Sequence, residues 1–240
     1  MNFLKPTGLA VAVGLMLASC GNQGNTVETT EAQDVAEATG QTLTIDTNTS
    51  KVNWMGYKPA GKHFGYIPLT NGELSVEGNA IKAGKFVFDL TQLKIEDMEE
   101  SNENYGKLFG HLQSDDFFDT ENHPLAVFEV TNVEPYASDD QVEDKEEFET
   151  DYTPNTMEEQ MVDNPTHWIS GNLTIRGNTK NIKFPAAVTL GDGSVSAKAG
   201  FNIDRTEWGV SYNDESNAVD KLKDNFIYNT VNIEFDIQAN

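Results

Sequence analysis

The sequence predicts an all-β domain of about eight strands, closed into a small barrel, with one helix beside it. Two observations lead to this prediction. Most of the chain alternates apolar and polar residues with a period of two, and turns rich in Gly, Asn and Asp divide it. One stretch, from Lys107 to Asp119, instead spaces Leu108 and Leu112 as a helix does. A sheet that closes into a barrel is still open at its two ends, so we expect this helix to cap one of them.

The strands are expected wherever the alternation is clean. Asn71 and Gly72 tolerate positive φ, so a hairpin turn is predicted at residues 70–72, between two of these strands. Further turns are predicted at residues 77–79 and 191–193. The expected strands cover Leu43 and Ile45, Val52 to Tyr57, then residues 63–69, 73–77, 81–93, 126–133, 195–203 and 227–237. Residues 167–190 are expected to form a strand, a turn and a partner strand.

Residues 1–20 read as a targeting signal. They carry Lys5, an apolar run over residues 9–17 that is too short to span a bilayer, and small residues typical of a cleavage site. Leu17-Ala18-Ser19-Cys20 resembles the lipobox of bacterial lipoproteins, which implies that Cys20 is lipidated and anchors the protein to a membrane. The alternative is an ordinary secretory signal with a chance cysteine. Since Cys20 is the only cysteine, an intramolecular disulfide is excluded.

Residues 21–40 are predicted to form a flexible tether, because they have only two sizeable apolar residues, both valines. The formal net charge is −23, and loss of Lys5 with the signal makes it −24. So acidic a chain argues against nucleic acid and against anionic headgroups bound through a basic patch. We expect a protein at the bacterial cell envelope, facing the periplasm or the cell surface; its oligomeric state stays open.

Residues 139–163 interrupt the pattern of the domain, which we place at residues 41–240. They hold eleven acidic residues against one Lys, and their few apolar residues follow no period. This composition predicts a solvated, mobile insertion. We therefore expect it to be dispensable for folding.

Three motifs together resemble one family. Residues 111–119 (HLQSDDFFD), 171–180 (GNLTIRGNTK) and 201–209 (FNIDRTEWG) look, in order and spacing, like the signatures of YceI-like proteins. The resemblance implies a lipocalin-like antiparallel barrel with a capping helix, whose elongated apolar pore binds a polyisoprenoid or another long-chain lipid. The chain departs from the family at Leu108, where many members have Arg, and in its acidic insertion.

The candidate ligand-binding residues are mostly apolar side chains expected to face the pore. His111 and Arg205 are the polar candidates for a ligand headgroup, since a guanidinium offers a forked donor to phosphate or carboxylate. Arg205 could equally form a salt bridge with Asp204, and the aromatic residues could simply fill the barrel. The pore candidates are Trp54, Phe86, Phe88, Phe184, Phe201, Ile203, Trp208, Ile233 and Phe235, with Leu108, Leu112, Phe117 and Phe118 closing the mouth.

The sequence does not favour an enzyme. His111 lies four and five residues before Asp115 and Asp116, but no serine or cysteine nucleophile accompanies them in a recognisable motif. The four histidines are too far apart for a metal-ligand pair, so no metal and no cofactor are expected. A structural surface lipoprotein with a solid interior remains the alternative to a lipid-binding protein, and an enzyme using His111 the less favoured one.

Overall fold

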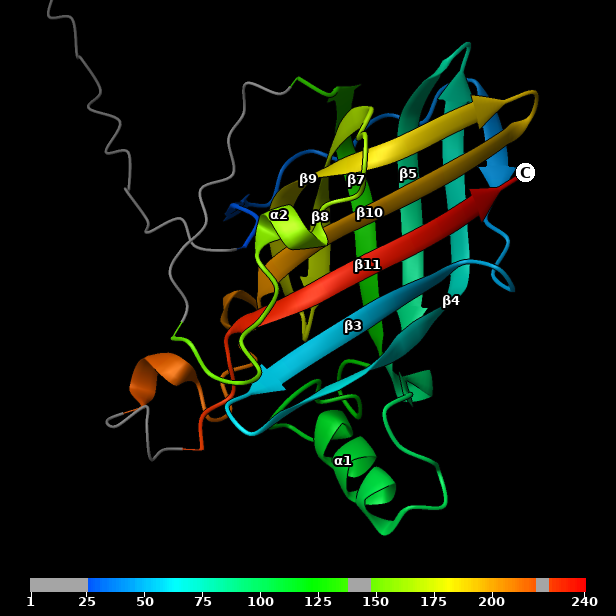
Figure 1. The fold of residues 1–240 in the computed structure, drawn as a ribbon. Helices are drawn as coiled ribbons and strands as arrows, with labels where there is room; N and C mark the ends of the chain where they lie inside the picture. The colour runs from blue at the N-terminus through cyan, green and yellow to red at the C-terminus, as the bar shows by residue number, and fades with distance from the viewer. Residues whose placement is uncertain (1–25, 138–147, 219–224) are drawn as a thin grey trace, which may run out of the picture.

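The computed structural model describes residues 26–137, 148–218 and 225–240. Eight antiparallel strands close into a barrel in the order β3-β4-β5-β7-β8-β9-β10-β11, and β11 pairs with β3 to complete it (Figure 1). The predicted lipocalin-like barrel is therefore confirmed. The strands are β3 (Lys51–Lys58), β4 (Gly61–Glu77), β5 (Ala80–Asp89), β7 (Leu125–Pro135), β8 (His167–Ile175), β9 (Asn178–Gly191), β10 (Ser194–Asp204) and β11 (Thr230–Ala239).

Short elements extend the barrel and cover it. In Figure 1, α1 lies beneath the lower end of the barrel, and α2 lies in front of β10. None of the helices within the described residues has the length and apolar character needed to cross a membrane. The short strands are β1 (Thr29–Glu31), β2 (Gln41–Thr44) and β6 (Lys94–Ile95), and the helices are η1 (Leu90–Gln92), α1 (Glu103–Gln113), α2 (Met157–Gln160), η2 (Arg205–Trp208) and η3 (Glu215–Asn217).

Turn residues explain most of the hairpins, with one exception. Arg176 and Gly177, both at positive φ, connect β8 to β9, as a two-residue hairpin loop requires. The turn predicted at residues 70–72 is wrong, because β4 continues through it with an irregularity between Leu69 and Asn71. Gly72 serves close packing instead: a Cβ there would lie 2.7 Å from Cγ1 of Ile45.

The helix begins and ends earlier than predicted. Its first residue is Glu103, since the Asn102 side chain accepts a hydrogen bond from Asn104 N and caps it. Its last residue is Gln113, so the two phenylalanines predicted at its exit lie in a turn that follows. That turn folds back on the helix through a hydrogen bond from Phe118 N to the Leu112 carbonyl (3.1 Å).

The predicted flexible tether is wrong for residues 27–36, which we call the N-terminal strap. Val27 is only 6% exposed, and β1 pairs with the β9 residues 180–182. Further along, the main chain of Gln33 exchanges two hydrogen bonds with the side chain of Asn172 (3.0 and 2.7 Å). A polar composition does not prevent order here, because the strap uses backbone hydrogen bonds and a buried side-chain amide rather than apolar burial. Residues 21–25 lie outside the described residues.

The predicted mobile insertion is wrong for residues 148–161, which we call the second strap. Met157 is 1% exposed and its sulfur accepts from Asn202 N (3.1 Å). Thr156 and Glu159 form a capping box at the start of α2. The average acidity of residues 139–163 hid this one fully buried methionine. Its burial argues against the expectation that the whole segment is dispensable for folding, which stays a prediction. Residues 138–147 lie outside the described residues.

Buried amides lie beneath the second strap, on the outer face of the barrel. Asn202 of β10 and Asn232 of β11 are 0% and 3% exposed and are hydrogen-bonded to each other. Asn202 Nδ2 also donates to the Asn155 carbonyl of the strap (2.8 Å), and the Tyr57 hydroxyl donates to Asn232 Oδ1. Burial raises the pKa of Tyr57 to about 12. The strap is therefore attached to the wall by a dry polar network.

Candidate ligand-binding cavity

An apolar cavity of about 230 Å³ lies inside the barrel. Its walls come from all eight barrel strands, and Leu112, Phe117 and Phe118 close it at the α1 end. Of the residues predicted to line a pore, those that line this cavity are Trp54, Phe86, Phe88, Leu112, Phe117, Phe118, Phe184, Phe201, Ile203, Arg205, Trp208, Ile233 and Phe235.

Several lining residues were not predicted. Most continue an alternation that the sequence displays, such as Val52 beside Trp54, so extending each face to the ends of its strand would have found them. Leu90 continues the alternation of Phe86 and Phe88, although it lies in a 3₁₀ helix after β5, whereas Leu93, which follows that helix, carries no such signal. The residues missed include Val52, Ile67, Leu74, Ile81, Leu90, Leu93, Phe128, Val130, Ile169, Leu173, Ile182, Val231 and Ile237.

Five phenylalanines form a continuous chain of rings across the interior. The Phe86 and Phe128 ring centroids are 6.2 Å apart, Phe128 and Phe184 5.7 Å, and Phe201 and Phe235 6.4 Å. Phe184 and Phe201 stack at 4.3 Å with an interplanar angle of 8°. Aromatic rings thus fill part of the barrel, as one alternative proposed, but a cavity remains beside them.

Arg205 lines the cavity, yet its donors are bound to the main chain. Nε, Nη1 and Nη2 donate to the carbonyls of Tyr228 (3.0 Å), Val210 (2.6 Å) and Ile227 (3.0 Å). Burial lowers the pKa of the guanidinium. Asp204, its expected salt-bridge partner, instead caps η2. This geometry supports a structural role for Arg205, which joins η2 to the segment before β11, rather than the predicted contact with a headgroup.

Two other predicted residues lie off the cavity. Leu108 packs in a cluster of the lid, with Leu93 and Tyr105 among others. His111 lies at the rim, where its Nε2 is 3.0 Å from Asp116 Oδ2 and its ring meets Tyr212 edge-on at 4.7 Å. The pair is half-exposed, so it lies at the surface of the rim rather than inside the cavity.

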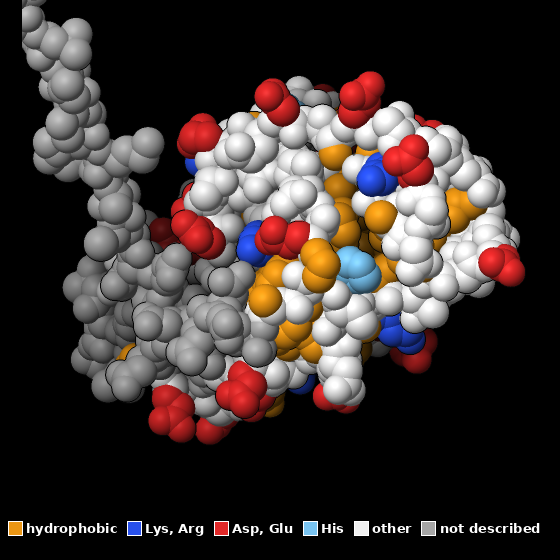
Figure 2. Space-filling view, turned by 90° about the horizontal axis from the view of Figure 1, so that it is seen from above, with side chains coloured by type: hydrophobic (Ala, Val, Ile, Leu, Met, Phe, Trp, Pro, Cys, Tyr) orange, Lys and Arg blue, Asp and Glu red, His pale blue; other side chains and the backbone are white. Residues whose placement is uncertain are grey.

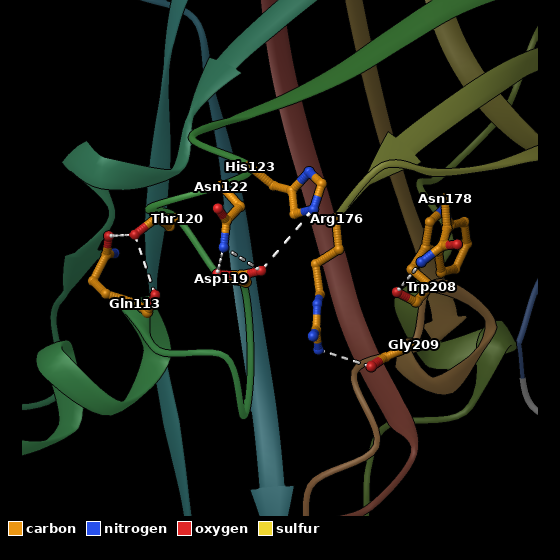
Figure 3. Close-up of polar contacts among 9 residues, drawn as sticks. All are labelled: Gln113, Asp119, Thr120, Asn122, His123, Arg176, Asn178, Trp208 and Gly209. Atoms are coloured by element: carbon orange, nitrogen blue, oxygen red, sulfur yellow. Dashed lines mark hydrogen bonds and ion pairs between the residues drawn. The ribbon is translucent and has the colours of Figure 1, made fainter.

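Polar contacts hold the loops at the α1 end of the barrel (Figure 3). Asp119 accepts from Asn122 Nδ2 (2.9 Å) and lies 4.0 Å from His123 Nε2. Across the mouth, Arg176 Nη1 donates to the Gly209 carbonyl (2.8 Å). Within the described part of the chain, no group of three or more His, Cys, Asp or Glu could hold a metal ion.

The two tryptophans of the cavity wall differ in whether the indole N–H is hydrogen-bonded. Trp208 Nε1 donates to the Leu173 carbonyl (2.8 Å). Trp54 Nε1 is buried and finds no partner among the described residues. An unpaired buried donor costs about 1–3 kcal/mol. Trp54 packs against the apolar cluster of Leu93, Tyr105 and Leu112, so its unpaired N–H lies at the α1 end of the barrel.

The opposite end of the barrel also exposes apolar surface. Seen from above, hydrophobic side chains gather in a hollow, and acidic side chains lie around the edge of this face (Figure 2). Leu74 and Ile81, which flank the β4–β5 hairpin, line the cavity toward this end. The cavity therefore extends well beyond the lid.

Together these features define a lipocalin-like barrel that encloses one apolar cavity under a helical lid. Residues 43–239 match the model of the YceI-like domain, and the chain belongs to that family. No curated protein matches it significantly.

Two solved structures are similar in fold. Burkholderia cenocepacia BcnA is 14% identical, with a TM-score of 0.56, over 82% of this chain and 99% of that one. A polyisoprenoid binding domain from Saccharophagus degradans, implicated in plant cell wall breakdown, is 13% identical, with a TM-score of 0.50, over 86% of this chain and 98% of that one.

Proposed function

We propose that this protein binds a long-chain apolar ligand, a polyisoprenoid or another lipid, inside the barrel. The observation that carries the proposal is the cavity, whose walls are apolar side chains from every barrel strand. Such a site gains free energy from apolar contact at roughly 25 cal/mol per Å² of buried surface, before ordering costs. The one charged residue in its wall, Arg205, bonds a main-chain carbonyl through each of its three nitrogens, so the cavity suits the hydrocarbon part of the ligand.

The comparisons add support of a different kind. One of the similar folds is a polyisoprenoid binding domain, and the family match spans all eight barrel strands. We place the polar end of the ligand at the α1 end, near the unpaired Nε1 of Trp54 and the polar rim that includes His111. No catalytic step is part of the proposal.

The protein is further proposed to act at the bacterial envelope, held to a membrane by a lipid on Cys20. This residue lies outside the described residues, and the proposal rests on the lipobox-like Leu17-Ala18-Ser19-Cys20. Cys20→Ser should release the protein from the membrane fraction into the soluble one. An unchanged membrane fraction would contradict the anchor without affecting the cavity.

The test of the ligand is extraction and titration. Protein purified gently from its own host should yield a long-chain lipid in organic extracts examined by mass spectrometry. After delipidation it should bind a fluorescent long-chain probe saturably, with one site per barrel. An empty protein with no saturable binding would favour the structural lipoprotein, whereas turnover of a substrate that is lost in His111→Ala would favour an enzyme.

A further inference from the structure

Two glycines in the lid helix have no packing role. Gly106 and Gly110 lie one turn apart in the interior of α1, and both are exposed. A Cβ built at either position meets no atom within 4 Å. This differs from Gly171, where a Cβ would fall 2.2 Å from the Phe128 ring. Since alanine would fit at both helical positions, the glycines leave the helix less stable than its surroundings permit.

Few contacts hold the rest of α1 to the barrel: one buried side chain in its first turn, one in its last turn, and the polar contacts of its C-terminal end. Only Tyr105 and Leu112 of its eleven residues are buried. The C-terminal end is held, since Gln113 Nε2 donates to the Leu90 carbonyl (2.8 Å) and Gln113 Oε1 accepts from Thr120 Oγ1 (2.7 Å; Figure 3). At the N-terminal end the cap residue Asn102 is exposed, so water can replace its hydrogen bond.

Leu112 connects this helix to the cavity. It is 8% exposed, lies in the last turn of α1, and lines the cavity beside Phe117 and Phe118. A long chain cannot pass this end while Leu112 is in place. Unwinding of the last turn of the helix, which contains Gly110, would withdraw Leu112 from the wall.

We propose that the α1 lid opens by local unfolding of the helix, and that Gly106 and Gly110 set how often it opens. This rests on the proposed function, since it describes the passage of the ligand. Unfolding starts at the N-terminal turn and proceeds toward Gln113, which stays attached to η1 as the hinge. Because the closed state dominates, the glycines govern the rates of ligand entry and exit together, while the affinity changes little.

The experiment measures association and dissociation rates of a fluorescent long-chain probe by stopped flow. Gly106→Ala combined with Gly110→Ala should slow both rates by roughly tenfold, the combined helix-propensity gain of two glycine replacements, with nearly unchanged Kd. Lys107→Gly, at an exposed position of the same helix, should accelerate both. Lys107→Ala is its control, because it removes the same ion pair with Glu103 and keeps helix propensity.

Amide hydrogen exchange at residues 104–113 checks the mechanism directly: protection should rise in the double alanine variant and fall in Lys107→Gly. Unchanged probe rates in both would overturn the proposal and assign ligand passage to the hollow end opposite α1 or to another route. A change in only one of the two rates, and hence in Kd, would also overturn it. If the wild-type protein binds no probe at all, the proposed function fails first, and the exchange data alone still decide whether the glycines control lid opening.

Discussion

On the inner face of the barrel wall, Phe184 and Phe201 stack beside a cavity, whereas on the outer face Asn202 and Asn232 are buried beneath a segment of the chain. The inner face is apolar and incompletely filled. The outer face is polar, dry and fully covered where the straps cross it. The difference teaches that a barrel which keeps space inside for a ligand can gain part of its stability from layers added outside.

The two straps use the same device. Asn172 holds the N-terminal strap and Asn202 holds the second one, each through a buried amide that bonds the main chain of the strap. An amide pairs with both N–H and C=O groups, so it satisfies a backbone that has no neighbouring strand. We therefore expect changes beneath the straps to alter stability and leave binding intact, and changes that fill the cavity to abolish binding.

The largest effect is expected at Met157, the buried anchor of the second strap. Met157→Ala should cost about 2–5 kcal/mol of unfolding free energy, as large-to-small changes at buried sites do. Urea unfolding measures the loss, and Met157→Leu, which conserves volume, should cost less than about 1.5 kcal/mol. A Met157→Ala variant as stable as the wild type would show that the strap adds little.

Two alanines on neighbouring strands allow the filled and the unfilled parts of the barrel interior to be compared. Ala186 is 0% exposed and does not line the cavity, whereas Ala197 does. Ala186→Trp should cost about 1–3 kcal/mol through overpacking, and Ala197→Trp less, because its ring enters the cavity. Only Ala197→Trp should abolish probe binding. Equal destabilisation by both would mean that the space beside Ala197 is not available to a ligand.

The N-terminal strap gives a smaller effect. Asn172→Ala should cost about 1–2 kcal/mol, since it leaves the Gln33 main chain without its two side-chain partners and removes one of the two acceptors of the buried Asn181 amide. The rate of amide hydrogen exchange at residues 29–36 should also rise in this variant. Gln33→Ala is the matched control, because Gln33 reaches Asn172 through main-chain atoms that the substitution keeps. If both variants loosen the strap alike, the buried amide is not what holds it.

The smallest effect is a pH dependence of the outer rim. Burial lowers the pKa of His167 at the start of β8, so the unfolded chain binds its proton more readily than the folded one. Stability from this group is therefore present above its ordinary pKa and is lost as the pH falls through the lower folded value. Between about pH 8 and pH 5, wild type should lose more stability than His167→Gln. An equal loss of stability in the wild type and in His167→Gln would show that His167 does not cause this pH dependence.

The sequence predicted the inner face well and the outer face poorly, for a physical reason. Inward residues such as Phe184 and Ile233 repeat with the strand period, so their direction follows from alternation alone. The partners of Asn172 and Met157 lie in distant segments, and no local pattern announces that a polar side chain will be covered. The acidic average over residues 139–163 and the sparse valines of residues 21–40 therefore predicted mobility where the straps are ordered.

The turn at residues 70–72 and the lid show the same limit. Asn71 and Gly72 have the composition of a hairpin turn. In the structure, a glycine is needed at position 72 because Ile45 packs against it and leaves no room for a side chain. The predicted helix begins at Lys107, four residues after the observed start at Glu103. The reason is that the first turn, with Glu103 and Tyr105, lacks the leucine spacing of the second half. Arg205 looked like a headgroup contact because a guanidinium usually meets an anion, and only the fold shows that three carbonyls surround it.

The most direct test of the division between the two faces is the stabilisation that a saturating long-chain probe gives, read as the shift in urea midpoint. Ligand binding to the folded state alone stabilises by RT ln(1 + [L]/Kd), so the shift reports the cavity and not the straps. We predict the same gain in unfolding free energy for wild type and Met157→Ala, and none for Ala197→Trp. A gain that survives in Ala197→Trp, or that disappears in folded Met157→Ala, would contradict the account.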